Sequence, residues 1–268
     1  MTYNIVMYKI RENCYIPEIL LNVCCNQDVN GEHQLLKTII SNSKPSSVIF
    51  DIGATKSKFP SFSNTHEFHL FDPSFEYEPT IDYSTCRVNT RALNSTDCTL
   101  DAYCEQNNIS HIEFLKIDTD GHDIDVLRGA SKMLKNTKHI QIEYDIFYLF
   151  KKLNVNDLYE LLKGFLIYKI TATGLKKVDA INEDYIYSNY LFTRNEFSME
   201  PLQLDCLFFS QMFQDLPFEY IKDAFENSKQ PFLEDKYSID LQQYLQQYFA
   251  GYMKTFISGL PLDTIPRL

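Results

Sequence analysis

The sequence has no apolar run that approaches the roughly 18 residues needed to cross a membrane. Its first residues also lack the charged leader and apolar core of a secretory signal. Basic stretches are missing as well, and the formal net charge is −11. Because proteins bind nucleic-acid phosphates mainly through clustered Lys and Arg, this balance argues against a nucleic-acid partner. We therefore expect a soluble cytoplasmic protein.

Pairs of cysteines in a C-x-x-C arrangement are absent too. The chain has seven cysteines, an odd number, and its 268 residues are enough to fold without disulfides. Adjacent Cys24 and Cys25 would point to opposite sides of an extended segment, which suits neither a shared metal nor a disulfide. These patterns predict free thiols.

The most informative stretch is residues 112–130. It begins as an apolar, β-leaning run and ends abruptly in Asp118, Asp120 and Gly121. A helical pattern follows from Ile124 and is expected to continue through Leu134. The stretch therefore predicts a buried strand that carries carboxylates at its carboxyl end. In open α/β sheets, ligands bind at that end.

An earlier strand, around residues 48–52, ends in a sharp turn with the sequence Asp51-x-Gly53-Ala54. Glycine here permits close approach and unusual backbone angles, and we expect the space that a side chain would fill to be needed by a bound cofactor. Little room for a helix follows, and Pro60 interrupts it. We therefore expect a shortened or irregular first helix.

The second strand is expected to end at Asp72, which lies 21 residues after Asp51. In this class of sheet, an acidic residue at about that distance from the glycine turn holds both ribose hydroxyls of an adenosine. A compressed third unit is expected around Arg87. The next helix is expected to begin at Ser95 or Thr99, because either side chain can cap it.

Strands and helices alternate from about residue 32 to residue 195. This alternation predicts an α/β fold with a mostly parallel sheet, helices on both faces and an antiparallel last strand. We expect an N-terminal cap at residues 1–30, a Rossmann-like domain at 31–197 and a helical C-terminal extension at 198–268. The extension could cover the active site, form a homodimer interface or extend the core.

The stretch Lys116–Ala130 fits K-I-D-x-[DE]-G-H-[DE]-x-x-V-L-x-G-A and resembles the signature of the FkbM family of S-adenosylmethionine-dependent O-methyltransferases. The turn at Asp51 is similar to the motif D-x-G-A-x-x-G, although Ser57 replaces its second glycine, and the family also has an acid before proline, as at Asp72. The resemblance extends to about residue 195. It implies a Rossmann-like class I methyltransferase fold with S-adenosyl-L-methionine as cofactor.

Under this resemblance, two groups of residues form the site. His122 could accept a proton at neutral pH, and Asp118 could do so or orient the acceptor hydroxyl. Acids after neighbouring strands could also bind Mg²⁺, which is not expected here. The candidate cofactor-binding residues are Glu32, Asp51, Gly53, Ala54, Asp72, Ala92 and Leu93; the catalytic candidates are Asp118, Asp120 and His122; the metal candidates are Asp118, Glu143 and Asp145.

These expectations favour an O-methyltransferase that acts on a hydroxyl of a sugar, a glycan or a related small molecule. Abundant aromatic residues would suit stacking on a pyranose ring. Ser57 and the short first helix leave an alternative open, a non-catalytic binding or scaffold protein on the same fold. A nicotinamide enzyme would need G-x-G-x-x-G, and a nucleic-acid methyltransferase would want an N-P-P-Y-like motif with a basic groove; the sequence has neither.

Overall fold

The computed structural model describes residues 7–11, 14–17, 27–28, 30–171, 174–181 and 187–199. The helices expected within residues 198–268, and with them a homodimer interface there, lie outside these ranges, as does most of the expected cap. Within the described ranges, no helix has the length and apolar character to cross a membrane.

The chain divides into two compact units, which are described separately. In the unit formed by Met1–Leu21 and Gln203–Leu268, strands β1 (Met7–Arg11) and β2 (Cys14–Pro17) pair antiparallel. The second unit, Asn22–Leu202, contains an eight-stranded sheet and all the helices described below.

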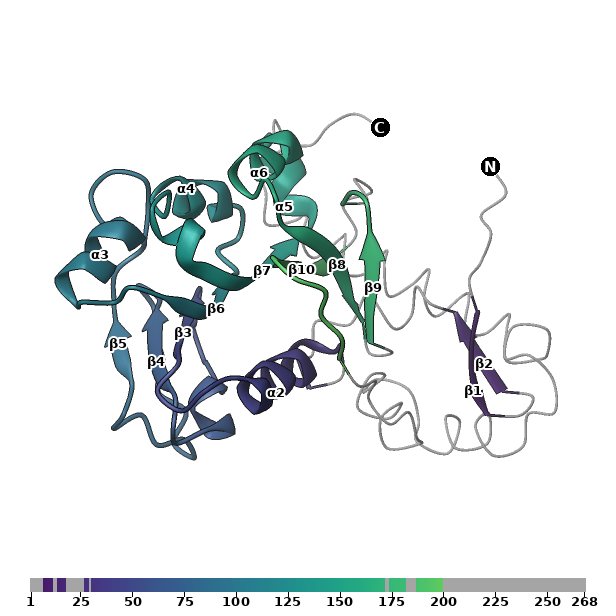
Figure 1. The fold of residues 1–268 in the computed structure, drawn as a ribbon, viewed down its shortest axis with the longest axis horizontal. Helices are drawn as coiled ribbons and strands as arrows, with labels where there is room; N and C mark the ends of the chain where they lie inside the picture. Colours follow the sequence, from purple (N-terminus) through teal and green to yellow (C-terminus); the bar gives the residue numbers. More distant parts are fainter. Residues whose placement is uncertain are drawn as a thin grey trace, which may run out of the picture. The chain divides into compact units, whose positions relative to one another are not determined.

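The sheet has the strand order β5-β4-β3-β6-β7-β10-β8-β9 (Figure 1). Neighbouring strands from β5 to β7 are parallel, whereas β10 runs antiparallel to both β7 and β8, and β9 is antiparallel to β8. This arrangement confirms the mostly parallel, Rossmann-like class I methyltransferase fold with an antiparallel last strand. The strands are β3 (Val48–Ile52), β4 (Glu67–Phe71), β5 (Arg87–Asn89), β6 (Ile112–Ile117), β7 (Thr137–Tyr144), β8 (Leu166–Thr171), β9 (Gly174–Val178) and β10 (Ser188–Thr193).

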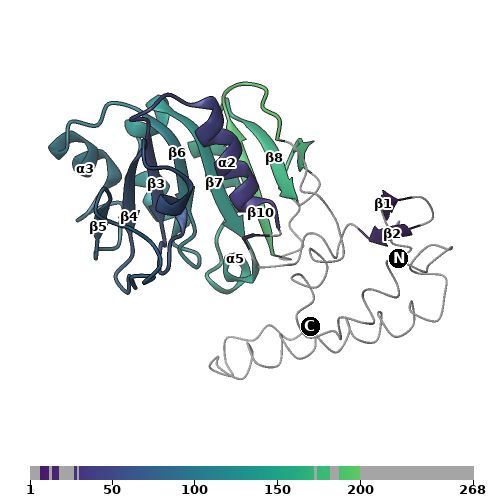
Figure 2. The same cartoon turned by 90° about the horizontal axis from the view of Figure 1, so that it is seen from below.

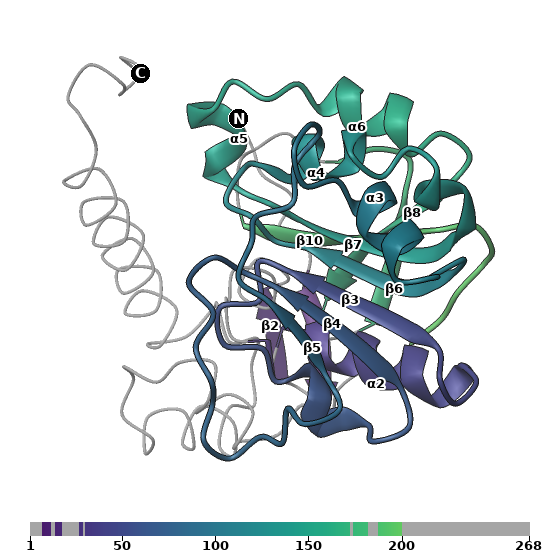
Figure 3. The ribbon, with the colours of Figure 1, turned by 90° about the vertical axis from the view of Figure 1, so that its left-hand side faces the viewer.

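Helices cover both faces of the sheet (Figures 2 and 3). On one face, α2 (Glu32–Asn42) buries Leu35, Leu36 and Ile39 in a cluster with apolar side chains of β3, β4 and β6. The other face packs against α3 (Leu100–Gln106), α4 (Asp123–Arg128) and α6 (Val155–Leu161). All six residues of β6 are consequently buried, because the strand lies in the middle of this sandwich.

The first crossover, between β3 and β4, has no full helix. The first crossover holds one 3-10 turn, η1 (Phe59–Phe62), with proline in its first turn, which confirms the prediction of an irregular first helix. Helix α3 begins after Thr99, whose hydroxyl accepts a hydrogen bond from the amide of Ala102 at 3.1 Å.

Two details differ from the sequence prediction. The helix expected to continue through Leu134 ends at Arg128, and a separate 3-10 turn, η2 (Met133–Asn136), follows it. The chain leaves the helix at Gly129, where an added Cβ would lie 2.1 Å from the carbonyl oxygen of Asn94. The short helix α5 (Ile146–Phe150) was not predicted.

Candidate functional site

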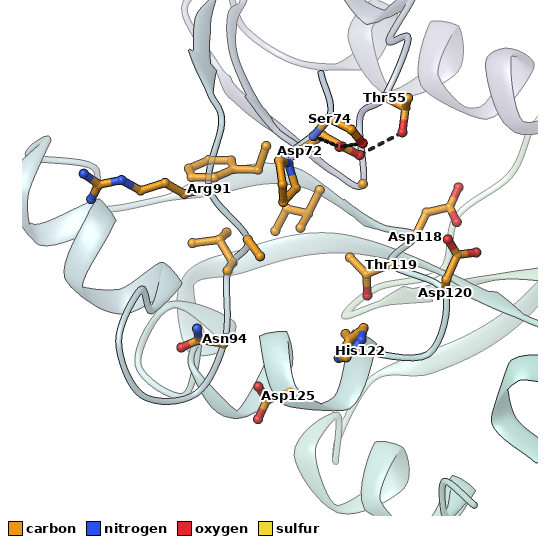
Figure 4. A pocket seen from close by; sticks show the side chains of 16 residues that line it. Thr55, Asp72, Ser74, Arg91, Asn94, Asp118, Thr119, Asp120, His122 and Asp125 are labelled. Atoms are coloured by element: carbon orange, nitrogen blue, oxygen red, sulfur yellow. Dashed lines mark hydrogen bonds between the residues drawn. The ribbon is translucent and has the colours of Figure 1, made fainter. Parts of the chain in front are cut away.

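A pocket of about 690 Å³ lies at the carboxyl ends of β3, β4 and β6 (Figure 4). Its volume falls within the roughly 300–1,000 Å³ of small-molecule sites. Asp72 follows β4, residues 118–120 and His122 follow β6, and Gly53 and Thr55 follow β3, which lies between those two strands. This is the edge of the sheet at which the sequence predicted ligand binding.

Asp72 follows β4 and is held in one orientation at the pocket wall. Its Oδ2 accepts a hydrogen bond from the hydroxyl of Thr55 at 2.8 Å. Its Oδ1 accepts two more, from the amide and the hydroxyl of Ser74, both at 2.7 Å (Figure 4). Because three donors fix the side chain, its remaining acceptor positions are preorganised for a ligand's hydroxyl groups.

Gly53 lines the pocket, but the structure gives another reason for the glycine than the one expected from sequence. Its φ is +89°, and an added Cβ would lie 1.6 Å from the carbonyl oxygen of Asp118. The close approach is therefore between the ends of two neighbouring strands, β3 and β6. Residue 53 must be glycine for the protein itself, with no ligand required.

Asp51 and Ala54 are buried next to this turn and do not line the pocket. The Oδ2 atom of Asp51 accepts a hydrogen bond from the hydroxyl of Ser57 at 2.6 Å, while its Oδ1 has no hydrogen-bond partner. Burial raises the pKa of Asp51. Ser57, which departs from the motif, thus supplies a buried donor to the first acid of that motif.

Asp118, Asp120 and His122 line the same end of the pocket (Figure 4). Asp118 Oδ2 accepts a hydrogen bond from Lys116 Nζ at 2.7 Å. Asp120 has a left-handed backbone (φ +51°), and burial together with the charge of Asp118 raises its pKa. His122 precedes α4 without using its side chain as a cap.

Ala92 and Leu93 also line the pocket, on a loop that α4 holds in place. Asp125 accepts hydrogen bonds from Ser95 at both carboxylate oxygens, 2.5 Å from the hydroxyl and 3.3 Å from the amide. The sequence prediction missed Asp125, which lies three residues after His122 and so on the same side of the helix. Helical spacing in the motif was the signal that could have identified it.

Glu32 does not line the pocket. It begins α2, is 3% exposed, and lies in a buried network of amide side chains. Its carboxylate accepts hydrogen bonds from Asn30 at 2.6 Å, from Gln141 at 2.6 Å and from Asn189 at 3.1 Å. Burial raises its pKa. The structure therefore places this candidate among polar side chains of the sheet.

The three carboxylates considered for Mg²⁺ do not share the pocket, because Asp118 lines it and Glu143 and Asp145 do not. Burial raises the pKa of Glu143 well above its ordinary value and that of Asp145 to about 6. Over the described part of the chain, no group of three His, Cys, Asp or Glu side chains could hold a metal ion.

The raised pKa of Asp123, at the start of α4, leads to a testable prediction about how stability depends on pH. Asp123 is 2% exposed, its Oδ1 accepts hydrogen bonds from the amide and hydroxyl of Thr119, and burial raises its pKa to about 7. Because the pKa is higher in the folded than in the unfolded state, protonated Asp123 favours the folded state at acidic pH. This stabilisation is lost as pH rises through about 7. Each pKa unit corresponds to about 1.4 kcal/mol, so the ionised group costs on the order of 4 kcal/mol at alkaline pH.

We expect Asp123→Asn to be more stable than the wild type at pH above about 7 and no more stable under acidic conditions, because asparagine keeps the acceptor and cannot ionise. Urea unfolding across this pH range measures the difference. Asp179→Asn, at an exposed position, is the control and should change little. A pH-independent loss of stability in Asp123→Asn would contradict the assignment.

Residues 7–166 match a family profile described as "Methyltransferase FkbM domain". No curated protein sequence matches the chain. One similar solved structure is the N-methyltransferase NodS from Bradyrhizobium japonicum, with 10% identity and a TM-score of 0.34, covering 61% of this chain and 94% of that one. Another is a TehB-like SAM-dependent methyltransferase from Corynebacterium glutamicum, with 11% identity and a TM-score of 0.34, covering 60% and 88%.

The family profile covers more than half of the chain and includes β3, β4, β6 and the pocket at their carboxyl ends. Membership implies methyl transfer with S-adenosylmethionine as the cofactor. The pocket fits that molecule, because it pairs a preorganised carboxylate at Asp72 with apolar side chains such as Ile52 and Phe71. The chain therefore belongs to the FkbM family of methyltransferases.

Proposed function

We propose that this methyltransferase transfers the methyl group to a hydroxyl of a sugar or glycan. The observation that carries the proposal is one pocket with two unlike ends. Asp72 lies at one end, after β4, Asp118, Asp120 and His122 lie at the other, after β6, and Gly53 lies between them, after β3. We assign the function to residues 31–197, with residues 1–30 as a cap and residues 198–268 as an extension.

The first end suits the adenosine part of S-adenosylmethionine. Asp72 would accept hydrogen bonds from the ribose hydroxyls, since its two oxygens are already oriented by Thr55 and Ser74. Ala92 and Leu93, with Ile52 and Phe71, would contact the adenine through apolar surface. Asp51 and Glu32 are buried and do not line the pocket. They would act on the cofactor only through the residues next to it or through its positive charge.

The second end suits the acceptor hydroxyl. When bound, S-adenosylmethionine supplies an electrophilic methyl group on a positively charged sulfur. As the acceptor oxygen bonds to that carbon and the carbon–sulfur bond breaks with its electron pair on sulfur, residues at this end would orient the hydroxyl and take its proton. Asp120 and His122 can take this proton, whereas Asp118 already accepts a hydrogen bond from Lys116 and suits the orientation of the hydroxyl.

An aromatic loop supports a sugar as acceptor. Tyr77 is 65% exposed and makes edge-on contacts with Phe75 and Tyr83, with ring centroids 5.1 and 5.4 Å apart. The loop is fixed to the pocket wall, because the amide of Glu76 donates a hydrogen bond to the carbonyl of Thr55 at 2.7 Å. An exposed tyrosine ring in a fixed position can stack on a pyranose. A divalent metal is not part of this proposal.

Asp72→Ala tests the cofactor end. We expect a loss of about 10-fold or more in affinity for S-adenosylmethionine, because two hydrogen bonds to a charged acceptor disappear. Isothermal titration calorimetry measures it, and Asp179→Ala, outside the pocket lining, is the control. Unchanged affinity in Asp72→Ala would contradict the placement of the ribose.

Titration of the wild-type protein also decides between the two functional classes. Absence of binding at millimolar S-adenosylmethionine would favour the alternative, a non-catalytic binding or scaffold protein. If the cofactor binds, transfer of a radiolabelled methyl group onto a panel of sugars, nucleotide sugars and glycans identifies the acceptor. Transfer to an amine or a thiol, with none to hydroxyls, would contradict the O-methylation proposal.

A further inference from the structure

Lys116 lies in the middle of the sheet, where lysine is unusual. It is buried, with 3% of its surface exposed. Its partners in the strand register are Asp51 on β3 and Gln141 on β7. Side chains in register on parallel strands share one face, so a polar row crosses the centre of the sheet.

Two carboxylates contact the ammonium group of Lys116 from different strands. Asp118 Oδ2 is 2.7 Å from Nζ, and Asp51 Oδ1, which has no hydrogen-bond partner, is 3.9 Å from it. Asp118 lies two residues after Lys116, so both side chains point to the same face of the sheet. One buried cation thereby links the acid of the glycine turn to an acid that lines the pocket.

Further acids surround the same cation. Burial alone would lower the pKa of Lys116, but the charges of Asp118, Asp51 and Glu32 outweigh burial and raise it, so the side chain stays charged. Glu143 belongs to the same cluster, because the charges of Asp118, Glu32 and Lys116 all act on it. Without the ammonium, these carboxylates would be buried together with no compensating charge.

A second lysine–carboxylate pair, between β7 and β6, provides the contrast. Lys138 on β7 is 2.7 Å from Glu113 on β6, but its side chain is 40% exposed and neither residue lines the pocket. We therefore expect its loss to leave a bound ligand unaffected. The pair of Lys116 and Asp118 differs, because Asp118 lines the pocket.

We propose that Lys116 is a positioning residue of the active site, which holds the carboxylate of Asp118 in the orientation that the acceptor hydroxyl requires. This inference rests on the proposed function. One oxygen of Asp118 binds the ammonium, and the other is left to accept a hydrogen bond from the acceptor. The proton released in methyl transfer then goes to Asp120 or His122, the other side chains of that end of the pocket that can take it.

The first experiment needs no acceptor. In protein labelled with ¹³C at the aspartate carboxyl carbon, the Asp118 resonance is identified by its absence in Asp118→Asn. We expect Lys116→Met to shift and broaden this resonance at neutral pH, and Lys116→Arg, which keeps the charge, to restore much of its position. Lys138→Met should leave it unchanged. A folded Lys116→Met variant with an unchanged Asp118 resonance would overturn the proposal.

If Lys116→Met does not fold, the converse measurement uses the Lys116 side-chain ¹⁵N resonance, assigned with Lys116→Arg. This resonance should shift in Asp118→Asn and stay in place in Glu113→Gln. No shift in Asp118→Asn would overturn the proposal. Both spectra report on the pair itself, so they stand even if the protein proves to methylate something other than a sugar.

The second experiment measures turnover with the acceptor found in the screen. Lys116→Met should reduce kcat by about 10-fold or more. In the Asp118→Asn background, the same change should have little further effect on kcat, because Lys116 acts through Asp118. Additive losses in the double variant would show that Lys116 only supports the fold, and would overturn the proposal. Titration with S-adenosylmethionine in parallel separates this outcome from a failure to bind the cofactor.

Discussion

Replacing Gly53 by alanine is expected to remove cofactor binding and to destabilise the protein by about 3 kcal/mol or more. Two costs combine at this position. A left-handed backbone disfavours any Cβ, and this Cβ would lie 1.6 Å from the carbonyl oxygen of Asp118. That oxygen belongs to the backbone directly after β6, which lines the pocket. It can therefore move only if the pocket wall moves with it.

Gly164→Ala is the matched control for this prediction. Gly164 has a nearly identical φ of +88°, but an added Cβ there meets nothing within 4 Å. The control should therefore show only the backbone cost, about 1–2 kcal/mol, and unchanged affinity for S-adenosylmethionine. Urea unfolding and calorimetric titration measure both variants. Equal losses at the two glycines would show that the contact with Asp118 is unimportant.

The second large effect is expected at Asp118. Asp118→Asn should lower kcat by about 100-fold or more while leaving the affinity for S-adenosylmethionine unchanged. Asp118 follows β6 and Asp72 follows β4, with β3 between them, so we place Asp118 at the acceptor hydroxyl and not at the adenosine. Asparagine keeps the size of the side chain but loses the charge and the strength of its hydrogen bonds.

Parallel variants assign the proton acceptor. Asp120→Asn and His122→Gln remove one candidate each, and the base should show the larger loss of kcat and an altered pH dependence. Titration with S-adenosylmethionine and thermal unfolding confirm that each variant binds the cofactor and folds. Normal turnover in Asp118→Asn would refute the role assigned to that residue.

The sequence was most informative where one pattern predicted both an element of the fold and the residues of the site. The run of apolar residues before Asp118 predicted a buried strand, and all six residues of β6 are buried. The carboxyl ends of parallel strands meet at one edge, so Gly53, Asp72 and Asp118 could be expected to lie together, and they line one pocket. The length of α4 was overestimated, because its end depends on the contact between Gly129 and the loop at Asn94.

Within the site, the sequence could not show the partners of side chains when those partners come from distant segments. Asp51 remains a predicted cofactor-binding residue, and the structure adds Ser57 and Lys116 as its buried neighbours. Glu32 is 109 residues from Gln141, which donates a hydrogen bond to it. Asp125 similarly holds Ser95, 30 residues before it. The spacing of residues along the chain does not reveal such long-range pairs.

The sequence by itself determined the class of fold, the family and the edge of the sheet that carries the site, because hydrophobic periodicity and short motifs depend on neighbouring residues. Only the tertiary structure decided which acids line the pocket, which lie buried near Lys116, and that Asp118 does both. That choice depends on strand register and on the buried partners of each carboxylate, since a carboxylate enters the interior only where donors or a cation compensate its charge.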